Sequence, residues 1–122
     1  MIYTTYFAKL RSLPKDITPV AICAKAPQGY QGPSYRALAP HYDFYSKYKI
    51  DGDTEYFMMC YNDQILRHMN PTRVVADLYA QAGKVYCDGD IALVCYEKST
   101  DFCHRHLVAE WLRNSGYDCK EF

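Results

Sequence analysis

The chain has 122 residues, enough for one domain with one hydrophobic core and too few for two independent ones. Fourteen basic residues balance fourteen acidic ones, so no global positive field favours general binding to duplex nucleic acid. No apolar stretch approaches the roughly 20 residues that cross a bilayer, and the N-terminal residues lack a signal-peptide pattern. We therefore expect a cytoplasmic protein with no membrane partner.

Six cysteines raise the question of disulfide bonds. Three of them lie inside apolar segments, no export signal is evident, and a chain of this size does not need covalent cross-links to fold. We expect all six thiols to be free.

Two strands and an irregular loop are predicted in the first third of the chain. β-Branched and aromatic residues favour strands over residues 2–7 and 18–23. The Gly- and Pro-rich segment 26–40 breaks regular structure directly after the second strand. Loops at the carboxyl ends of strands often bind ligands in α/β sheets, which makes Ser34 and Arg36 candidate ligand-binding residues. A solvated surface loop explains them equally well.

Three helices are predicted in the middle of the chain. Residues 40–50 can form a short helix, and a second one begins at Asp53 or Thr54, with apolar residues at three-to-four-residue spacing as far as Met69. We interpret this stripe, which includes Met58, as core packing rather than a cofactor pocket. Residues 70–82 follow as a helix with an Asn cap and Pro at its first position.

The C-terminal part is predicted to be a strand, a helix and a closing strand. Residues 91–95 are almost continuously apolar, which indicates a strand buried on both faces. The helix is expected over residues 101–114 and the last strand over residues 117–122. This order predicts a right-handed parallel crossover. The fold class is therefore α/β, a single three-layer domain over residues 1–122 with a small, mainly parallel sheet covered by helices.

Polar side chains gather in the first turn of the predicted C-terminal helix. Cys103, His104, Arg105 and His106 precede a core-facing apolar stripe. A helix N-terminus presents unpaired backbone amides and the positive end of the macrodipole, to which Arg and His add charge. The pattern predicts a site for phosphate or carboxylate, with Arg105, His104 and Cys103 as ligand-binding residues.

A structural network is the alternative explanation for Arg105. Glu97 and Asp101 both lie close enough in sequence to pair with its guanidinium, and Asp101 can cap the helix. In that case, replacing Arg105 would destabilise the fold rather than weaken ligand binding.

An enzymatic interpretation would use Cys103, His104 and Glu97. The helix dipole and neighbouring cations are expected to lower the pKa of the Cys103 thiol, as in cysteine nucleophiles. His104 would then act as general acid or base, oriented by Glu97. Cys103 as a small buried filler is the alternative. The Cys-x5-Arg loop of thiol phosphatases does not occur in the sequence.

Several residues of types that bind metals are close together in the last third of the chain, namely Cys87, Cys95, Cys103, His104 and His106. However, no Cys-x2-Cys or His-Glu-x2-His pair occurs, and Cys95 belongs to a predicted buried strand. Gly-x-Gly-x-x-Gly, P-loop and Gly-x-Ser-x-Gly motifs are also missing from the sequence. We expect no bound metal and no cofactor.

Residues 93–112, LVCYEKSTDFCHRHLVAEWL, resemble the signature of a bacterial and phage family named domain of unknown function 488. The resemblance continues in PSYRALAP (residues 33–40), YSKY (residues 45–48) and the Asn-Pro pair at 70–71. It implies a cytosolic α/β domain and names a site without naming a reaction. The family pattern singles out Cys95, Glu97, Cys103, His104 and Arg105, with Ser34 and Arg36 as a second cluster.

These observations lead to three functional hypotheses. The first is a binding module for a phosphorylated, nucleotide-like small molecule, with some of the thirteen tyrosines stacking on a base. In a phage-encoded member, such a module would sequester a nucleotide signal. The second is an enzyme acting on a nucleotide or nucleic acid, and the third is a protein-interaction module. The sequence leaves a homo-oligomer open.

Overall fold

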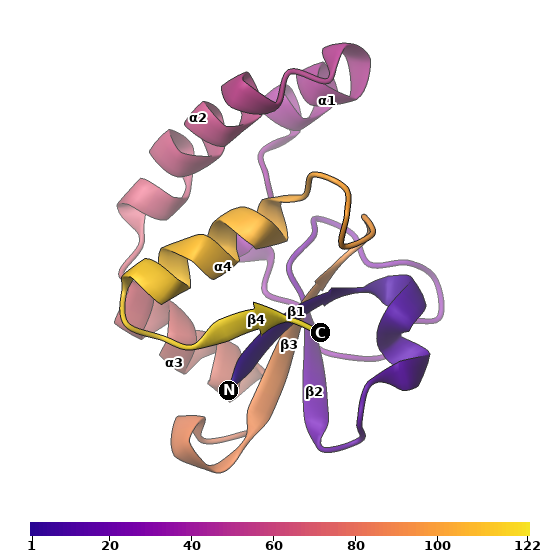
Figure 1. The fold of residues 1–122 in the computed structure, drawn as a ribbon, viewed down its shortest axis with the longest axis vertical. Helices are drawn as coiled ribbons and strands as arrows, with labels where there is room; N and C mark the ends of the chain where they lie inside the picture. The colour runs from indigo at the N-terminus through magenta and orange to yellow at the C-terminus, as the bar shows by residue number, and fades with distance from the viewer.

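A parallel sheet lies between two unequal layers (Figure 1). This computed structural model describes the backbone of residues 1–122 and every side chain except that of Cys87. The α-helices lie on one side of the sheet, and a short 3-10 helix with the loop of residues 24–35 lies on the other. The predicted α/β class and three layers are confirmed, although the second outer layer is thin.

Four strands in the order β2-β3-β1-β4 form the sheet, and all three pairings between neighbours are parallel. Their bounds are β1 (Ile2–Tyr6), β2 (Ile17–Ala21), β3 (Asp90–Cys95) and β4 (Cys119–Glu121). β3 is an interior strand, and all its residues from Ile91 to Cys95 are buried. This burial on both faces confirms what the continuous apolar run predicts.

Pro19 fits into β2 because this strand is at the edge of the sheet. The backbone of Ala21, two residues further on, bonds outward to Pro33 and Tyr35 rather than to β3. Residues two apart in a strand direct their backbone groups to the same side. Pro19 therefore places its missing N–H on the outer side, where β3 loses no hydrogen bond.

The C-terminal unit crosses over one intervening strand. β4 pairs with β1, in register from Ile2 opposite Cys119 to Thr4 opposite Glu121, and β1 separates it from β3. The connecting α4 packs against both β1 and β3. This crossover brings the last residues of the chain back beside the first ones.

The α-helices are α1 (Tyr42–Asp51), α2 (Thr54–Gln64), α3 (Pro71–Gln81) and α4 (His104–Asn114). The 3-10 helices are η1 (Phe7–Ser12), η2 (Arg36–Leu38), η3 (Leu66–His68) and η4 (Tyr86–Asp88). Two predicted helix starts are confirmed by their caps, because Asp53 accepts from the Tyr56 N–H and Asn70 from the Arg73 N–H.

The second predicted helix is shorter than its apolar stripe suggested. α2 ends at Gln64, and η3 continues the chain with a tighter turn. Phe57 and Tyr61 are buried as expected, but Met58 is 37% exposed and does not belong to the core. Met58 directly follows the buried Phe57 in the helix. Because each residue of a helix is rotated about 100° from the one before it, Met58 points away from the core.

One hydrophobic core fills the space between the sheet and all four α-helices. Leu93 and Val20 are paired in register and therefore point to the same face of the sheet. Both belong to one buried cluster with Leu112 of α4 and Leu78 of α3. The opposite face is covered by smaller contacts, in which Phe7 of η1 packs against Tyr30 with ring centroids 5.3 Å apart.

Replacing Leu93 with Ala tests this assignment of the core. Leu93 is fully buried in the interior strand, so the free energy of unfolding should fall by about 2–5 kcal/mol. Met59→Ala is the control, because Met59 is 54% exposed and should change stability by no more than about 0.5 kcal/mol. Urea denaturation followed by circular dichroism measures both, and equal effects would contradict the assignment.

Candidate functional site

The carboxyl ends of β2 and β3 border a cavity of about 240 Å³. Its walls come from the loop after β2, the start of α1, the end of β3 and the N-terminus of α4. The lining residues are Cys23, Ala24, Lys25, Pro40, Tyr42, Tyr45, Cys95, Tyr96, Glu97 and His104. Open α/β sheets usually bind their ligands at this edge.

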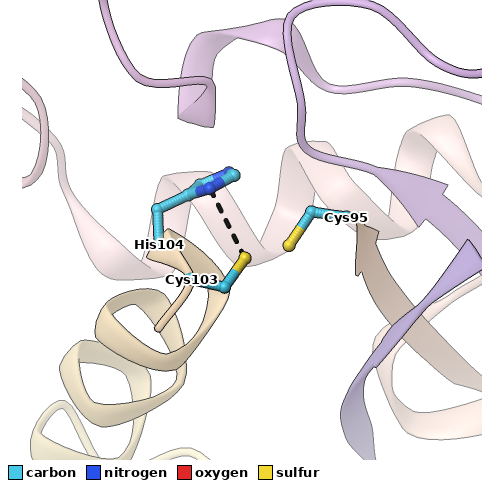
Figure 2. A group of neighbouring side chains, drawn as sticks. All are labelled: Cys95, Cys103 and His104. Carbon is cyan, nitrogen blue, oxygen red and sulfur yellow. Dashed lines mark hydrogen bonds between the residues drawn. The ribbon is translucent and has the colours of Figure 1, made fainter. Parts of the chain in front are cut away.

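Two thiols and an imidazole form a compact cluster beside the cavity (Figure 2). Cys95 is the last residue of β3, whereas Cys103 and His104 stand at the start of α4. One donor atom from each residue lies within 4.8 Å of the other two, and all three residues are buried. Figure 2 shows the Cys103 sulfur between the His104 ring and the Cys95 sulfur.

A backbone carbonyl fixes the orientation of the His104 ring. The Nε2 atom lies 2.7 Å from the carbonyl oxygen of Ile22, the residue that follows β2. A carbonyl oxygen only accepts, so Nε2 carries the proton of this hydrogen bond and donates it. The other ring nitrogen, Nδ1, takes no part in this hydrogen bond and lies 3.8 Å from the Cys103 Sγ atom.

The Cys103 thiol is not activated in the way that the sequence indicated. The neighbouring Cys95 thiol and burial both raise the pKa of Cys103, and they outweigh the lowering effect of His104. The prediction of a lowered pKa was therefore wrong for this arrangement. The physical reason is that the Cys95 thiol is a hydrogen-bond neighbour and that Cys103 is only 3% exposed, so both the contact and desolvation disfavour a thiolate.

The N-terminus of α4 also differs from the prediction. The helix begins at His104 rather than at Asp101, and Cys103 is its N-cap residue with no side-chain cap. Asp101 instead closes a turn, because its N–H donates to the Lys98 carbonyl. The predicted capping role of Asp101 was wrong. Cys103 consequently lies at the cap position rather than inside the first turn.

Arg105 is the largest fully buried side chain described in the structure. Its Nη2 and Nε atoms donate to the two carboxylate oxygens of Glu121, at 2.8 and 3.2 Å. Its Nη1 atom donates to the Glu97 carbonyl at 2.6 Å and to the Cys95 Sγ atom at 3.4 Å. Figure 1 shows why these elements meet, since β4 returns beside β1 directly below α4.

This network corresponds to the structural alternative for Arg105, with a different carboxylate. Glu121 of β4 occupies the place that the sequence analysis gave to Glu97 or Asp101. Glu97 contributes its backbone carbonyl to the network, and the residue is also part of the cavity lining. The guanidinium has no exposed surface, so a phosphate cannot reach it in this structure.

Ser34 and Arg36 lie outside the cavity wall. Both side chains are exposed, and neither is among the residues that line the cavity. Ser34 forms an isolated bridge with Ala21 on the outer side of β2, and Arg36 begins η2. The structure therefore does not bring this second cluster together with Cys95, Cys103 and His104.

Several residues of the site were missed by sequence reasoning. Lys25, Tyr42 and Tyr96 line the cavity, and Glu121 holds Arg105. The position of Lys25 in the loop at the carboxyl end of β2 is the same signal that indicated Ser34 and Arg36, and Lys25 is closer to the end of the strand. No local signal points to Glu121, since its partner is 16 residues away and meets it only through the crossover.

The fold and the edge cluster together define a parallel α/β domain with a buried thiol-imidazole site at the carboxyl ends of its strands. A family model named DUF488-N3a, described as the active DUF488-N3 subclade, matches residues 3–116, and the chain belongs to this family. The resemblance seen in residues 93–112 is thereby confirmed. No curated protein and no solved structure shows a significant match. Every described helix is too short or too polar to span a bilayer.

Arg105→Ala should destabilise the fold by about 3–5 kcal/mol, because it leaves the partly buried Glu121 carboxylate without its partner. The matched control is Arg113→Ala on the same helix. Arg113 is exposed and donates to the Cys119 carbonyl, so its loss should cost about 1 kcal/mol. Denaturant unfolding of both variants measures the difference. Unchanged stability of Arg105→Ala would show that the network is not formed in solution.

The same ion pair predicts a pH dependence. Burial alone would raise the pKa of Glu121, but hydrogen bonds from Arg105 and Thr4 hold the pKa below its ordinary value. The contribution to stability is therefore complete above the unfolded pKa near 4.5 and is lost as pH falls through the lower folded pKa. Acidification should destabilise the wild type more than Glu121→Gln. Parallel pH profiles of the two proteins would contradict this assignment.

Proposed function

We propose that this chain is a binding module for a small, phosphorylated, nucleotide-like molecule that occupies the cavity at the carboxyl edge of the sheet. The observation that carries the proposal is the cavity, about 240 Å³ in volume and lined by Tyr42, Tyr45 and Tyr96. This volume is below the roughly 300–1,000 Å³ of sites for drug-sized ligands. A base or nucleoside therefore fits inside, and a phosphate would extend through the opening.

Aromatic side chains give the cavity its preference for a planar ligand. Tyr96 is held in place, because its hydroxyl donates to the Lys25 carbonyl and its ring lies 4.9 Å from that of Phe7. Tyr42, at the start of α1, is 81% exposed although it is a large aromatic residue. An exposed aromatic ring beside a cavity is suited to close over a bound base.

Charged groups around the cavity suit the polar parts of such a ligand. Lys25 is exposed on the loop after β2 and can reach a phosphate at the opening. It takes the place that the sequence analysis gave to Arg105, whose guanidinium is buried and already bonded. Glu97 lines the same cavity, and its carboxylate can accept from a ribose hydroxyl or a base amino group.

Calorimetric titration with nucleoside phosphates and the matching nucleosides tests the proposal. Tyr42→Ala should weaken binding by about 5- to 150-fold, which corresponds to the roughly 1–3 kcal/mol of one stacked base. Lys25→Ala should weaken the phosphorylated ligands more than the nucleosides. Tyr56→Ala and Lys15→Ala are the matched controls, because both residues are exposed and neither lines this cavity.

Two results would overturn the proposal. One is the absence of any binding across the ligand series, and the other is equal weakening by the cavity variants and their controls. Mass spectrometry of small molecules released from the natively purified chain gives an independent measurement. A phosphorylated, ultraviolet-absorbing compound is the expected result.

The contact between the Cys103 Sγ and His104 Nδ1 atoms favours an enzyme as the second candidate function. His104 Nδ1 is placed to take the Cys103 proton, and Glu97 faces the same cavity. An enzyme acting on the bound nucleotide would retain binding and lose turnover in Cys103→Ser. A pure binding module would show no turnover in the wild type.

A further inference from the structure

We propose that Cys95, Cys103 and His104 bind one zinc ion, with an open coordination position directed at the cavity. The three donor atoms lie within 4.8 Å of one another. With Zn–S bonds of about 2.3 Å and Zn–N bonds of about 2.0 Å, a tetrahedral ion holds a sulfur and a nitrogen about 3.5 Å apart. The Cys103 Sγ to His104 Nδ1 distance of 3.8 Å is slightly longer than that spacing, and the other pairs of donor atoms must close from at most 4.8 Å.

The donor set selects for a soft ion. Thiolate and imidazole ligands favour zinc or copper(I) and disfavour magnesium and calcium, which prefer oxygen. Two thiolates and a neutral imidazole around a zinc dication carry no net charge, which keeps the desolvation cost of the buried cluster low. Arg105 Nη1 donates to the Cys95 sulfur, while Glu121 balances the charge of the guanidinium.

The hydrogen bond of His104 supplies a second, independent indication. Histidines that bind metals usually donate their other ring N–H to a carboxylate, a carbonyl or water, which fixes the tautomer and the ring orientation. His104 has this arrangement, because Nε2 donates to the Ile22 carbonyl and Nδ1 is directed at the Cys103 sulfur. The ring is therefore oriented for metal binding by Ile22, the residue that follows β2, which contributes no ligand itself.

The number of ligands points to an accessible rather than a closed site. Structural zinc sites usually have four protein ligands, whereas sites that act on a substrate have three and an open position. Cys95 and His104 also line the cavity, so the remaining position faces it. This inference does not depend on the proposed nucleotide binding, because zinc needs only the three side chains.

The site differs from what the sequence analysis expected, which was no bound metal. The reason is that its ligands are not spaced as in a zinc knuckle. Cys103 and His104 are adjacent at a helix start, and Cys95 reaches them from the end of a strand. The three donor atoms come together only when α4 packs against the sheet.

Titration of the reduced, chelator-stripped chain with Co²⁺ tests the proposal. We expect sulfur-to-cobalt charge-transfer absorption that saturates at one equivalent and disappears when Zn²⁺ is added. Cys95→Ser, Cys103→Ser and His104→Gln should each weaken the apparent affinity by more than about a hundredfold, beyond the effect of a residue that only orients a ligand. Cys60→Ser and Cys119→Ser are matched controls, because both thiols are free, buried and outside the cluster.

A measurement without substitutions keeps the test decisive if a variant fails to fold. Zn²⁺ should slow the alkylation of Cys95 and Cys103 in the wild-type chain, as mapped by peptide mass spectrometry, and leave Cys60 and Cys119 unchanged. Three results would overturn the proposal: no charge-transfer band, a band that survives in Cys95→Ser and Cys103→Ser, or a disulfide between these two residues in the freshly purified chain. Nucleotide binding by the metal-free chain is scored separately, so failure of either proposal is distinguishable.

Discussion

The ion pair between Arg105 and Glu121 is the interaction on which the other parts of the site depend. It joins the first turn of α4 to the last strand, and the same guanidinium also bonds the Glu97 carbonyl and the Cys95 sulfur. The start of α4, the end of β3 and β4 are thus fixed to one planar group. The buried guanidinium cannot move far, because each hydrogen bond that it loses leaves a donor without water or a protein partner and destabilises the folded state. Arg105 therefore acts as a scaffold for the cluster rather than as part of its ligand surface.

Local patterns in the sequence were sufficient for most elements of the fold. The apolar run at residues 91–95 identified the interior strand, and Asp53 and Asn70 marked two helix starts correctly. The start of α4 was misplaced because Asp101 looks like a cap but belongs to a turn. Met58 was assigned to the core because helical spacing does not define the edges of an apolar face sharply.

The site was harder to predict because its essential contacts join distant segments. Sequence reasoning identified Cys103, His104 and Glu97, all within one segment. Local patterns did not indicate the Ile22 carbonyl, which lies 82 residues from His104 and directly after β2, or Glu121, which reaches Arg105 through the crossover. The Cys95 thiol and burial together reversed the expected shift in the pKa of Cys103, and both depend on the packing of β3 against α4. Local composition thus singled out residues that the structure places beside one cavity, but it did not specify their contacts.

The two walls of the cavity have different freedom to change during evolution. Cys95 and His104 belong to the packed junction of β3 and α4, where almost any substitution disturbs the core. Tyr42 stands on the exposed side of α1, a helix whose only fully buried side chain is Phe44. Mutations at the α1 wall therefore cost little stability. Related chains are free to change the shape and charge of this wall while they keep the same thiol-imidazole centre.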